Sequence, residues 1–313
     1  MSSHCLICLE LLEHSEAEGH YHGTCLSELF GTTRLPLIDA DRASLPLSLW
    51  KMAGGVSISG MQPKLSMRLS ADRSALETVE GGGEFILKPQ SPKYMFLPEN
   101  EHVTMRSALL AGIDIPPCGL VHLRDGSLAY IVRRYDRHIG DQVKLRQEDF
   151  CQLAQLPSQQ KENGSAELCV RLMRKFVTVS PETELAKLYR RIAFAYLTGN
   201  GDLHLKNLSL VIGRDGIPRL SPAYDQVCTC LVIPGDQLTL SICGKRDRLN
   251  RETFMLFARY AGLTPEAAGS ILSELSQSVP ALLSLISASL LPVEFKTAYT
   301  AILARRAEAL GKG

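Results

Sequence analysis

The segment from Gly199 to Asp225 constrains this chain most, because it carries three polar side chains at a chemically meaningful spacing. Asp202 is followed five residues later by Asn207 on the same predicted loop, and Asp225 comes eighteen residues after that. Enzymes that transfer phosphoryl groups use this layout: one Asp orients the attacking hydroxyl, while the Asn and the second Asp hold magnesium. An ordinary turn is the competing interpretation, since Gly-Asn-Gly-Asp is common in loops.

Apolar runs on both sides of this loop favour the phosphoryl-transfer interpretation. The run 192–197 leads into the loop as a helix, and 208–212 leads out as a strand. A Gly-Arg-Asp-Gly turn at 213–216 and a second short strand then lead to Asp225. This order is that of the C-lobe of a protein kinase. The sequence therefore predicts an α+β, two-lobed, protein-kinase-like fold with a β-rich N-lobe and a mostly helical C-lobe.

Composition excludes several classes of protein. The chain has 313 residues, with 34 Lys and Arg against 33 Asp and Glu, so a net charge of +1 argues against direct nucleic-acid binding. The nine cysteines are irregularly spaced, which favours a reducing cytoplasm over a disulfide framework. We expect no secretory signal and no membrane span, and we expect the apolar stretch 279–291 to be a core helix.

The first 30 residues stand apart because they contain a candidate metal site. A Cys-x-x-Cys pair and a His-x-x-Cys pair could supply four tetrahedral zinc ligands, namely Cys5, Cys8, His22 and Cys25. Zinc bound there would be structural, because no neighbouring residue is a candidate for catalysis. The competing interpretation is a short helix packed through Cys8 and nearby leucines, with solvated histidines.

A glycine- and serine-rich stretch, 54–60, precedes an alternating strand at 65–69. Without bulky side chains, its backbone N–H groups could approach phosphates closely. Ser57 and Ser59 could then accept a phosphoryl group. An ordinary hairpin turn is equally compatible with the pattern, which matches neither common nucleotide-binding motif.

Lys88 ends an apolar strand, 84–88, at a position where a kinase places the lysine that holds the α- and β-phosphates. Glu101 lies in a helix predicted from Pro98 to about residue 111, and it could pair with Lys88. Two alternatives remain open: Lys88 could be an exposed strand-end lysine, and the glutamates of the first helical turn could simply stabilise the helix dipole.

Residues 117–136 predict a β-hairpin, because an Asp-Gly turn separates two apolar runs. The charged segment 133–137 leaves the second strand, where it could offer backbone groups to adenine and Asp136 to a ribose hydroxyl. A solvated charged linker is the alternative. We accordingly divide the chain into a Cys/His segment at 1–30, an N-lobe at 31–140 and a helical C-lobe at 141–313.

Most of the C-lobe has a helical pattern, in which we include 147–156 and 166–177. Pro181 opens the helix that leads to the catalytic loop. Further helices are predicted at 254–262, 265–277 and 293–309, and 238–242 is predicted to be a strand.

Five blocks, in order along the chain, resemble the motifs of HipA-type serine/threonine kinase toxins. They are Ser57–Lys64, Tyr130–Arg137, Gln147–Gln152, Gly201–Asn207 and Ser221–Asp225. The resemblance extends from about residue 50 to 245 and implies a kinase that uses ATP and Mg²⁺. It implies that Asp202 is the catalytic base and that Asn207 and Asp225 bind the metal. It implies nucleotide contacts at Gly60, Lys88, Arg133, Tyr135, Asp136 and His204, and autophosphorylation at Ser57 and Ser59.

The stretch before residue 54 is too short for the extra N-terminal subdomain of long HipA members, so the chain resembles the short HipT form of tripartite systems. The resemblance implies three partners: a HipS-like small antitoxin, a HipB-like helix-turn-helix protein, and an aminoacyl-tRNA synthetase as substrate. A kinase-like repressor subunit with dispensable catalysis and a small-molecule kinase are the alternative functions.

Overall fold

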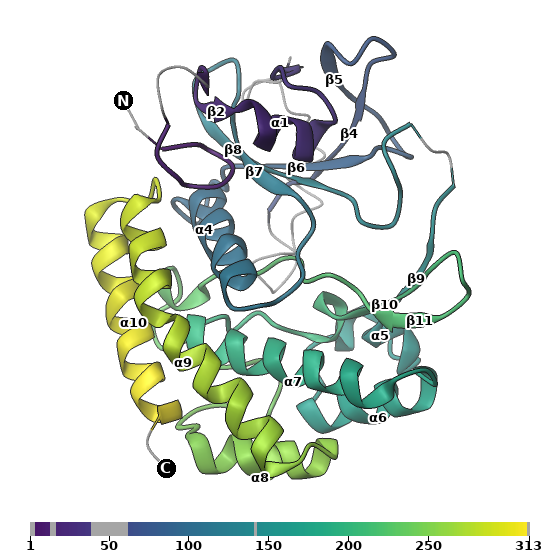
Figure 1. Cartoon of the computed structure of the whole chain (residues 1–313), viewed down its shortest axis with the longest axis vertical. Helices are drawn as coiled ribbons and strands as arrows, with labels where there is room; N and C mark the ends of the chain where they lie inside the picture. Colours follow the sequence, from purple (N-terminus) through teal and green to yellow (C-terminus); the bar gives the residue numbers. More distant parts are fainter. Residues whose placement is uncertain (1–3, 13–16, 39–61, 141–142, 312–313) are drawn as a thin grey trace. The chain divides into compact units, whose positions relative to one another are not determined.

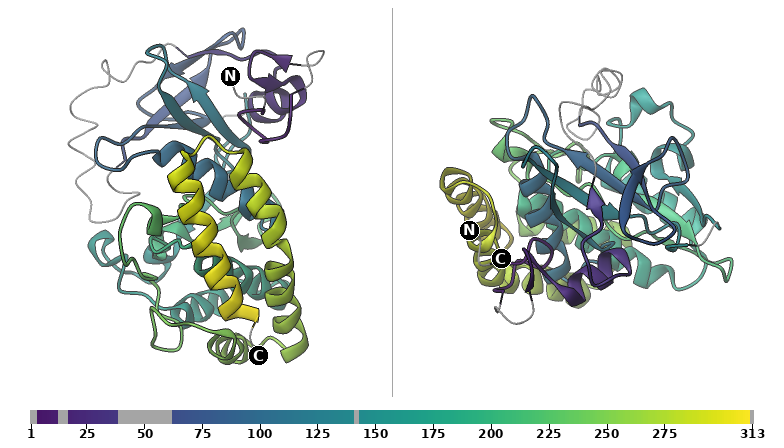
Figure 2. Two further views of the ribbon diagram at one scale, coloured as in Figure 1. Left: turned by 90° about the vertical axis from the view of Figure 1, so that its left-hand side faces the viewer. Right: turned by 90° about the horizontal axis from the view of Figure 1, so that it is seen from above.

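A computed structural model describes residues 4–12, 17–38, 62–140 and 143–311 (Figures 1 and 2). The chain forms two compact units. The first unit contains Met1–Arg106, Pro116–Lys144 and Leu285–Pro292. The second unit contains Ser107–Ile115, Leu145–Ser284 and Val293–Gly313.

The first unit is built on a six-stranded sheet, in which only β3 and β5 pair in parallel among the described strands. In spatial order the strands are β3 (Leu37–Ile38), β5 (Ala75–Thr78), β4 (Leu65–Leu69), β6 (Phe85–Pro89), β8 (Leu128–Arg133) and β7 (Cys118–His122). The predicted hairpin is confirmed as β7 and β8. Its turn is closed by the Ser127 N–H, which donates to Asp125 Oδ1 at 2.9 Å, and by Gly126 at φ 79°.

Buried and less buried positions alternate along β4, whereas most positions of β6 and β8 are buried. In β4, Leu65, Met67 and Leu69 are buried and the residues between them are not. In the centre, Leu87 of β6 pairs with Ile131 of β8, and neither side chain is exposed to solvent. The core of the first unit therefore lies around β6 and β8.

The N-terminal segment packs against this sheet. It contains β1 (Ala17–Glu18), β2 (Tyr21–His22) and α1 (Gly23–Phe30). The rings of Phe30 and Phe85 have centroids 5.5 Å apart, and Arg133 Nη1 donates to the carbonyl oxygen of Glu28 at 2.9 Å. Helix α4 (Leu97–Leu110) follows β6 and agrees with the predicted helix within one residue.

The second unit is mostly helical, and α7 (Pro181–Thr198) is its central helix. Helix α7 packs against α6 (Ala166–Phe176), α8 (Arg251–Ala261) and α10 (Val293–Gly311). The ring of Tyr189 stacks on Phe257 with centroids 5.7 Å apart, and Tyr196 lies 5.4 Å from Phe254. Pro181 starts α7, and Gly199 at φ 75° caps it by donating its N–H to Ala195 and Tyr196.

The second unit also contains a small antiparallel sheet of three strands. Its strands lie in the order β11 (Pro218–Leu220), β10 (Ser209–Ile212), β9 (Arg146–Asp149), so the predicted hairpin after the catalytic loop is confirmed. The predicted helix 147–156 is wrong in its first part. Residues of β9 pair with β10, and the short helix α5 (Phe150–Leu153) begins only after Asp149, whose carboxylate accepts from the Gln152 N–H.

Two further sequence predictions need correction. Residues 238–242 do not form a strand; Ser241 and Ile242 make only isolated bridges, to Ser165 and Lys245. Helix α9 (Pro265–Ala288) does not stop near residue 277 but continues through Pro280. Three 3₁₀ turns complete the described second unit: η2 (Ser158–Gln160), η3 (Leu205–Asn207) and η4 (Thr229–Leu231).

Helix α9 is long and apolar enough, by length and composition, to cross a membrane. Its most apolar window has a mean hydropathy of 1.3, and 33% of that window is buried. By length and composition, this helix therefore contradicts the expectation that the chain has no apolar run long enough to span a membrane. The finding is weak evidence for a membrane span, because core helices of water-soluble proteins satisfy the same criterion.

Glu184, a buried residue in the first turn of α7, provides a test of this packing. Its carboxylate accepts from the Leu220 N–H of β11 and from Lys187 Nζ, both at 2.7 Å. Replacing Glu184 with Ala should lower the free energy of unfolding in urea by about 1–3 kcal/mol, because the Leu220 N–H loses its acceptor. The matched control, Glu182→Ala, removes an exposed carboxylate from the same turn and should cost at most about 1 kcal/mol. Equal losses would contradict the assignment.

Glu99 in the first turn of α4 predicts a pH dependence of stability. Burial raises its pKa to about 7 from an ordinary value of 4.5. The folded state therefore binds this proton more tightly than the unfolded state, and stability should fall as pH rises from 4.5 to 7. Glu99→Gln has no carboxyl group to ionise, so it should avoid up to about 3 kcal/mol of that loss of stability. The variant should therefore be more stable than the wild type at pH 8 but not at pH 5. Urea unfolding at pH 5 and pH 8 measures the difference, with the exposed Glu80→Gln as control. An equal offset at both pH values would contradict the assignment.

Candidate active site

The loop that follows α7 is anchored through its backbone. The Gly201 N–H donates to Thr229 Oγ1 at 2.7 Å, and the Asp202 N–H donates to Asn200 Oδ1 at 3.1 Å. A Cβ atom on Gly201 would overlap the carboxylate of Asp236, so glycine is required where these segments meet. Asp202 is thereby placed, half-buried, on a loop that cannot easily shift.

Asn207 and Asp225 are brought together by this arrangement. Asn207 Nδ2 donates to Asp225 Oδ2 at 3.4 Å, although eighteen residues separate them. Asn207 Oδ1 accepts from the His204 N–H at 3.3 Å, which turns the side chain back over its own 3₁₀ turn. Because an amide oxygen has two lone pairs, that oxygen keeps acceptor capacity for a cation.

Asp225 has a left-handed backbone conformation, with φ 54°. A non-glycine residue in this region costs about 1 kcal/mol or more, and such residues cluster at functional sites. Its neighbours explain why it stays there: the Ala223 N–H donates to the Asp114 carbonyl at 2.7 Å, and Tyr224 Oη donates to the Lys206 carbonyl at 2.9 Å. Both bonds fix the segment that presents Asp225.

Three residues that support the loop were missed by sequence reasoning. Thr229 and Asp236 hydrogen bond to each other, and Thr239 Oγ1 donates to the Gly201 carbonyl at 2.6 Å. They lie 28 to 38 positions beyond Gly201 in irregular chain, so no periodic pattern could have identified them.

In the first unit, Lys88 and Glu101 form a buried ion pair. Lys88 is 2% exposed and Glu101 is 1% exposed, and Lys88 Nζ also lies 5.4 Å from the centre of the Tyr130 ring. The exposed strand-end lysine is therefore the wrong interpretation. Glu101 is the partner of Lys88, as its place in the predicted helix suggested.

The segment after β8 contains a second buried carboxylate, Asp136. Arg134 donates to both of its oxygens, from Nε at 2.9 Å and from Nη2 at 2.8 Å, and Arg137 lies 3.4 Å away. Burial tends to raise the pKa of Asp136, but the arginine contacts outweigh it and the pKa is lowered. A solvated linker is therefore the wrong interpretation of Asp136, and Arg134 is a supporting residue that sequence reasoning missed.

Other predicted nucleotide contacts stay predictions. Ser57, Ser59 and Gly60 lie outside the described residues. His204 is buried, and Arg133 and Tyr135 are half-buried in the segment before Asp136.

The four predicted ligands of the N-terminal segment form a cluster. The ligand atoms of Cys5, Cys8, His22 and Cys25 all lie within 4.8 Å of one another, so the group could hold a metal ion. Hydrogen bonds from the thiols of Cys25 and Cys8 lower the pKa of Cys5. The pKa of Cys25 is raised because its thiol donates to Cys5, and the pKa of Cys8 is raised as well. Without a metal the cluster therefore favours one thiolate, at Cys5, which is the form that binds metals.

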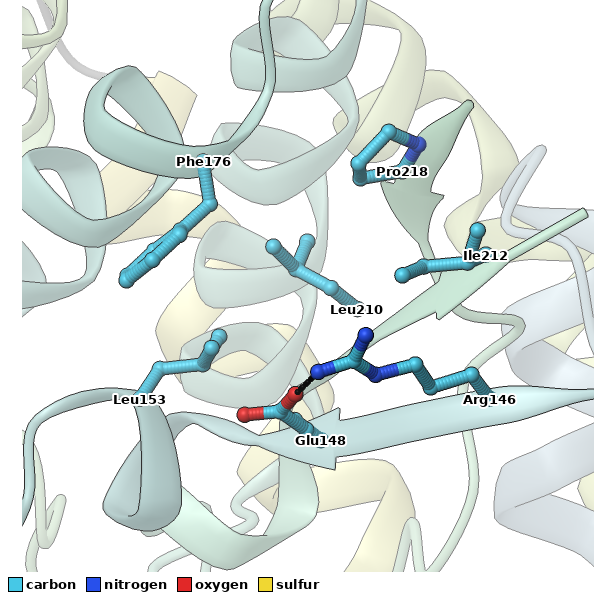
Figure 3. Close-up of a pocket in the computed structure, with 7 residues that line it drawn as sticks. All are labelled: Arg146, Glu148, Leu153, Phe176, Leu210, Ile212 and Pro218. Carbon is cyan, nitrogen blue, oxygen red and sulfur yellow. Dashed lines mark hydrogen bonds and ion pairs between the residues drawn. The ribbon is translucent and has the colours of Figure 1, made fainter. Parts of the chain in front are cut away.

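A pocket of about 190 Å³ in the second unit is lined by none of the predicted catalytic residues (Figure 3). Apolar side chains from β10, α5 and α6 form most of its wall, and an ion pair between Arg146 and Glu148 at 3.2 Å lies at one side. Another concavity, in the first unit, is polar and includes Arg68, Arg73 and Arg137.

Comparison with known proteins identifies relatives of this chain. A family model described as the HipA-like C-terminal domain matches residues 56–283. A Haemophilus influenzae protein named "Putative kinase" is 32% identical over 234 residues, which are 71% of this chain and 67% of that protein. The serine/threonine-protein kinase toxin HipA of Shewanella oneidensis is 29% identical over 204 residues, or 60% of this chain and 46% of HipA. This chain spans 54% and 51% of two Sinorhizobium fredii relatives, about half their length.

Two solved structures share the fold. Shewanella oneidensis HipA, in a complex with HipB and operator DNA, matches with a TM-score of 0.70 and 24% identity over 86% of this chain and 68% of that one. The Helicobacter pylori proinflammatory kinase CtkA matches with a TM-score of 0.53 and 12% identity over 72% of this chain and 86% of that one. The predicted α+β, kinase-like fold is confirmed. The family model covers most of the length of this chain, so the chain belongs to the family that carries the HipA-like C-terminal domain.

Proposed function

We propose that this chain is an ATP- and Mg²⁺-dependent serine/threonine protein kinase that acts as the toxin of a toxin–antitoxin system. The observation that carries the proposal is the 3.4 Å contact between Asn207 and Asp225, beside a loop that presents Asp202. Membership of the HipA-like family supports it, as do the names of the relatives.

The donor atoms fit magnesium. Asn207 and Asp225 offer an amide oxygen and a carboxylate, the hard oxygen ligands that Mg²⁺ prefers. The ion, when bound, would offset the negative charge of the nucleotide phosphates.

The remaining work falls to side chains of the chain itself. Asp202 would accept the proton of the substrate hydroxyl, and its anchored backbone means that little reorganisation is needed at the moment of transfer. Lys88 would bind phosphate oxygens, and Glu101 would hold its ammonium group in place. Asp136 and the backbone of its neighbours would contact ribose and adenine.

The finer parts of the proposal come from the family resemblance. We propose a cytoplasmic protein of the short HipT form, with an aminoacyl-tRNA synthetase as substrate and with HipS-like and HipB-like partners. The solved complex of Shewanella HipA with HipB supports a partner of the second kind. We propose autophosphorylation at Ser57 and Ser59, where added negative charge would disfavour nucleotide binding by repulsion.

Radiolabelled ATP separates this proposal from its alternatives. Purified chain, magnesium and labelled ATP are added to a bacterial lysate, and the labelled products are resolved and identified by mass spectrometry. A labelled aminoacyl-tRNA synthetase is expected. Label confined to metabolites would indicate a small-molecule kinase, and absence of transfer with intact nucleotide binding would indicate a binding subunit.

Substitution of two carboxylates should affect different steps. Asp202→Asn should lower phosphoryl transfer by about 10²–10⁴-fold while ATP still binds, because only proton acceptance is lost. Asp225→Asn should instead weaken Mg–ATP binding by roughly tenfold or more, because a metal ligand is lost. Calorimetry and single-turnover assays measure the two effects. Undiminished transfer by Asp202→Asn would refute the assignment of the base.

The ion pair of the first unit permits a test that separates folding from nucleotide binding. Lys88→Met alone should cost about 3–5 kcal/mol of stability, because it leaves the Glu101 carboxylate buried without its cation. The double variant Lys88→Met/Glu101→Leu should recover most of that stability and still bind ATP weakly.

Lys93→Met is the control, since Lys93 is an exposed lysine of the same unit. Urea unfolding measures stability, and calorimetry measures ATP affinity. If the double variant bound ATP as tightly as the wild type, Lys88 would have only a structural role.

A further inference from the structure

We infer that Cys5, Cys8, His22 and Cys25 form a closed, structural zinc site, and that the bound zinc braces helix α4 and strand β7 of the first unit. The inference is independent of the proposed kinase activity, because it concerns how the N-terminal segment is held against the sheet.

The spacing of the ligand atoms fits a tetrahedral ion. Zinc–sulfur bonds of about 2.3 Å and zinc–nitrogen bonds of about 2.0–2.1 Å place neighbouring ligand atoms about 3.6 Å apart. His22 Nδ1 lies 3.3 Å from Cys8 Sγ and 3.9 Å from Cys25 Sγ, and all four ligand atoms lie within 4.8 Å of one another. Only small adjustments are needed to reach the tetrahedral spacing.

The orientation of His22 is already that of a metal ligand. Its Nε2 lies 3.1 Å from the Leu11 carbonyl oxygen, which can only accept, so Nε2 carries the proton. Nδ1 is then the atom with a free lone pair, and it is the atom that faces the thiols. Ligating histidines in zinc sites usually hold their second ring nitrogen in this way.

The backbone around Cys5 is arranged as in a site that holds thiolates. The N–H groups of Ile7 and His22 donate to Cys5 Sγ at 3.4 Å and 3.5 Å. Such bonds spread the negative charge of a ligating thiolate. Cys5 is fully buried and all four positions are supplied by the protein, which leaves no open position for catalysis.

Three soft thiolates and an imidazole favour zinc over magnesium or calcium, which prefer oxygen ligands. The segment also needs such a crosslink. It is short, its only regular elements in the described residues are β1, β2 and α1, and small units of this kind commonly depend on a metal for their fold.

The two residues between Cys5 and Cys8 connect the site to the sheet. The Leu120 N–H of β7 donates to the Leu6 carbonyl at 2.8 Å, and Tyr21 Oη donates to the Leu120 carbonyl at 3.1 Å. The fit against β7 is close: a Cβ on Gly119 would lie 2.7 Å from Ile7 Cγ1.

A second connection reaches helix α4. The buried His102 Nε2 lies 2.9 Å from the Ile7 carbonyl oxygen, to which it donates. His102 follows Glu101, the partner of Lys88, directly in the chain. Zinc that fixes the Cys5–Cys8 turn therefore also fixes the part of α4 that carries the buried ion pair.

Metal content is the first test. Purified full-length chain should contain about one zinc per molecule by mass spectrometry of the metals, released when a mercurial reagent modifies the thiols. Replacement of zinc by cobalt should give the intense visible bands and the thiolate charge-transfer band of a tetrahedral sulfur-rich site. Cys8→Ser should lose these signals, and Cys243→Ser, outside the cluster, should keep them. A metal-free, folded wild-type chain, or a disulfide among these cysteines, would overturn the inference.

Hydrogen exchange tests the brace itself. Removing zinc with a chelator should speed amide exchange in β7 and in 97–106 of α4 by about tenfold or more, while α8 in the second unit should be unaffected. The variant His102→Ala keeps all four ligands, so it should retain zinc and yet show faster exchange in α4. If zinc removal left exchange in β7 and α4 unchanged, the metal would not be a brace.

Discussion

The contact of Gly201 with the segment around Asp236 is the constraint on which the candidate catalytic loop depends. There is no room for a side chain at this position. The Gly201 N–H donates to Thr229 Oγ1 and the Gly201 carbonyl accepts from Thr239 Oγ1, so the backbone is fixed on both sides. The loop therefore leaves the C-terminal cap of α7 with a fixed backbone. This brings Asn207 within hydrogen-bonding distance of Asp225. Positional accuracy of this kind is what phosphoryl transfer demands, because the protein contributes mainly orientation and charge.

In the first unit, buried ion pairs fix charged groups in place. Lys88 is neutralised by Glu101, and Asp136 by Arg134 and Arg137. Such pairs gain little net stability over apolar residues, but removal of one partner is strongly destabilising. They therefore hold charged groups at fixed places, which is useful where a polyanionic ligand must be bound.

Sequence reasoning succeeded where local signals were strong. The Asp-Gly turn predicted the β7–β8 hairpin, and the ligand spacing predicted the thiol cluster. It failed where distant partners decide the structure: 146–149 became a strand because β10 pairs with it, and 238–242 lacks the partner that a strand needs. The anchors of Gly201 could not be predicted either, because side-chain hydrogen bonds across irregular chain leave no periodic pattern.

The most direct test of the central claim is a crystal structure of the chain with manganese and a non-hydrolysable ATP analogue, since the anomalous signal of manganese locates the ion. An ion is expected about 2.2 Å from both Asn207 Oδ1 and an Asp225 carboxylate oxygen. An ion bound to the nucleotide without either residue, or a nucleotide bound with Asp225 directed away from it, would contradict the account.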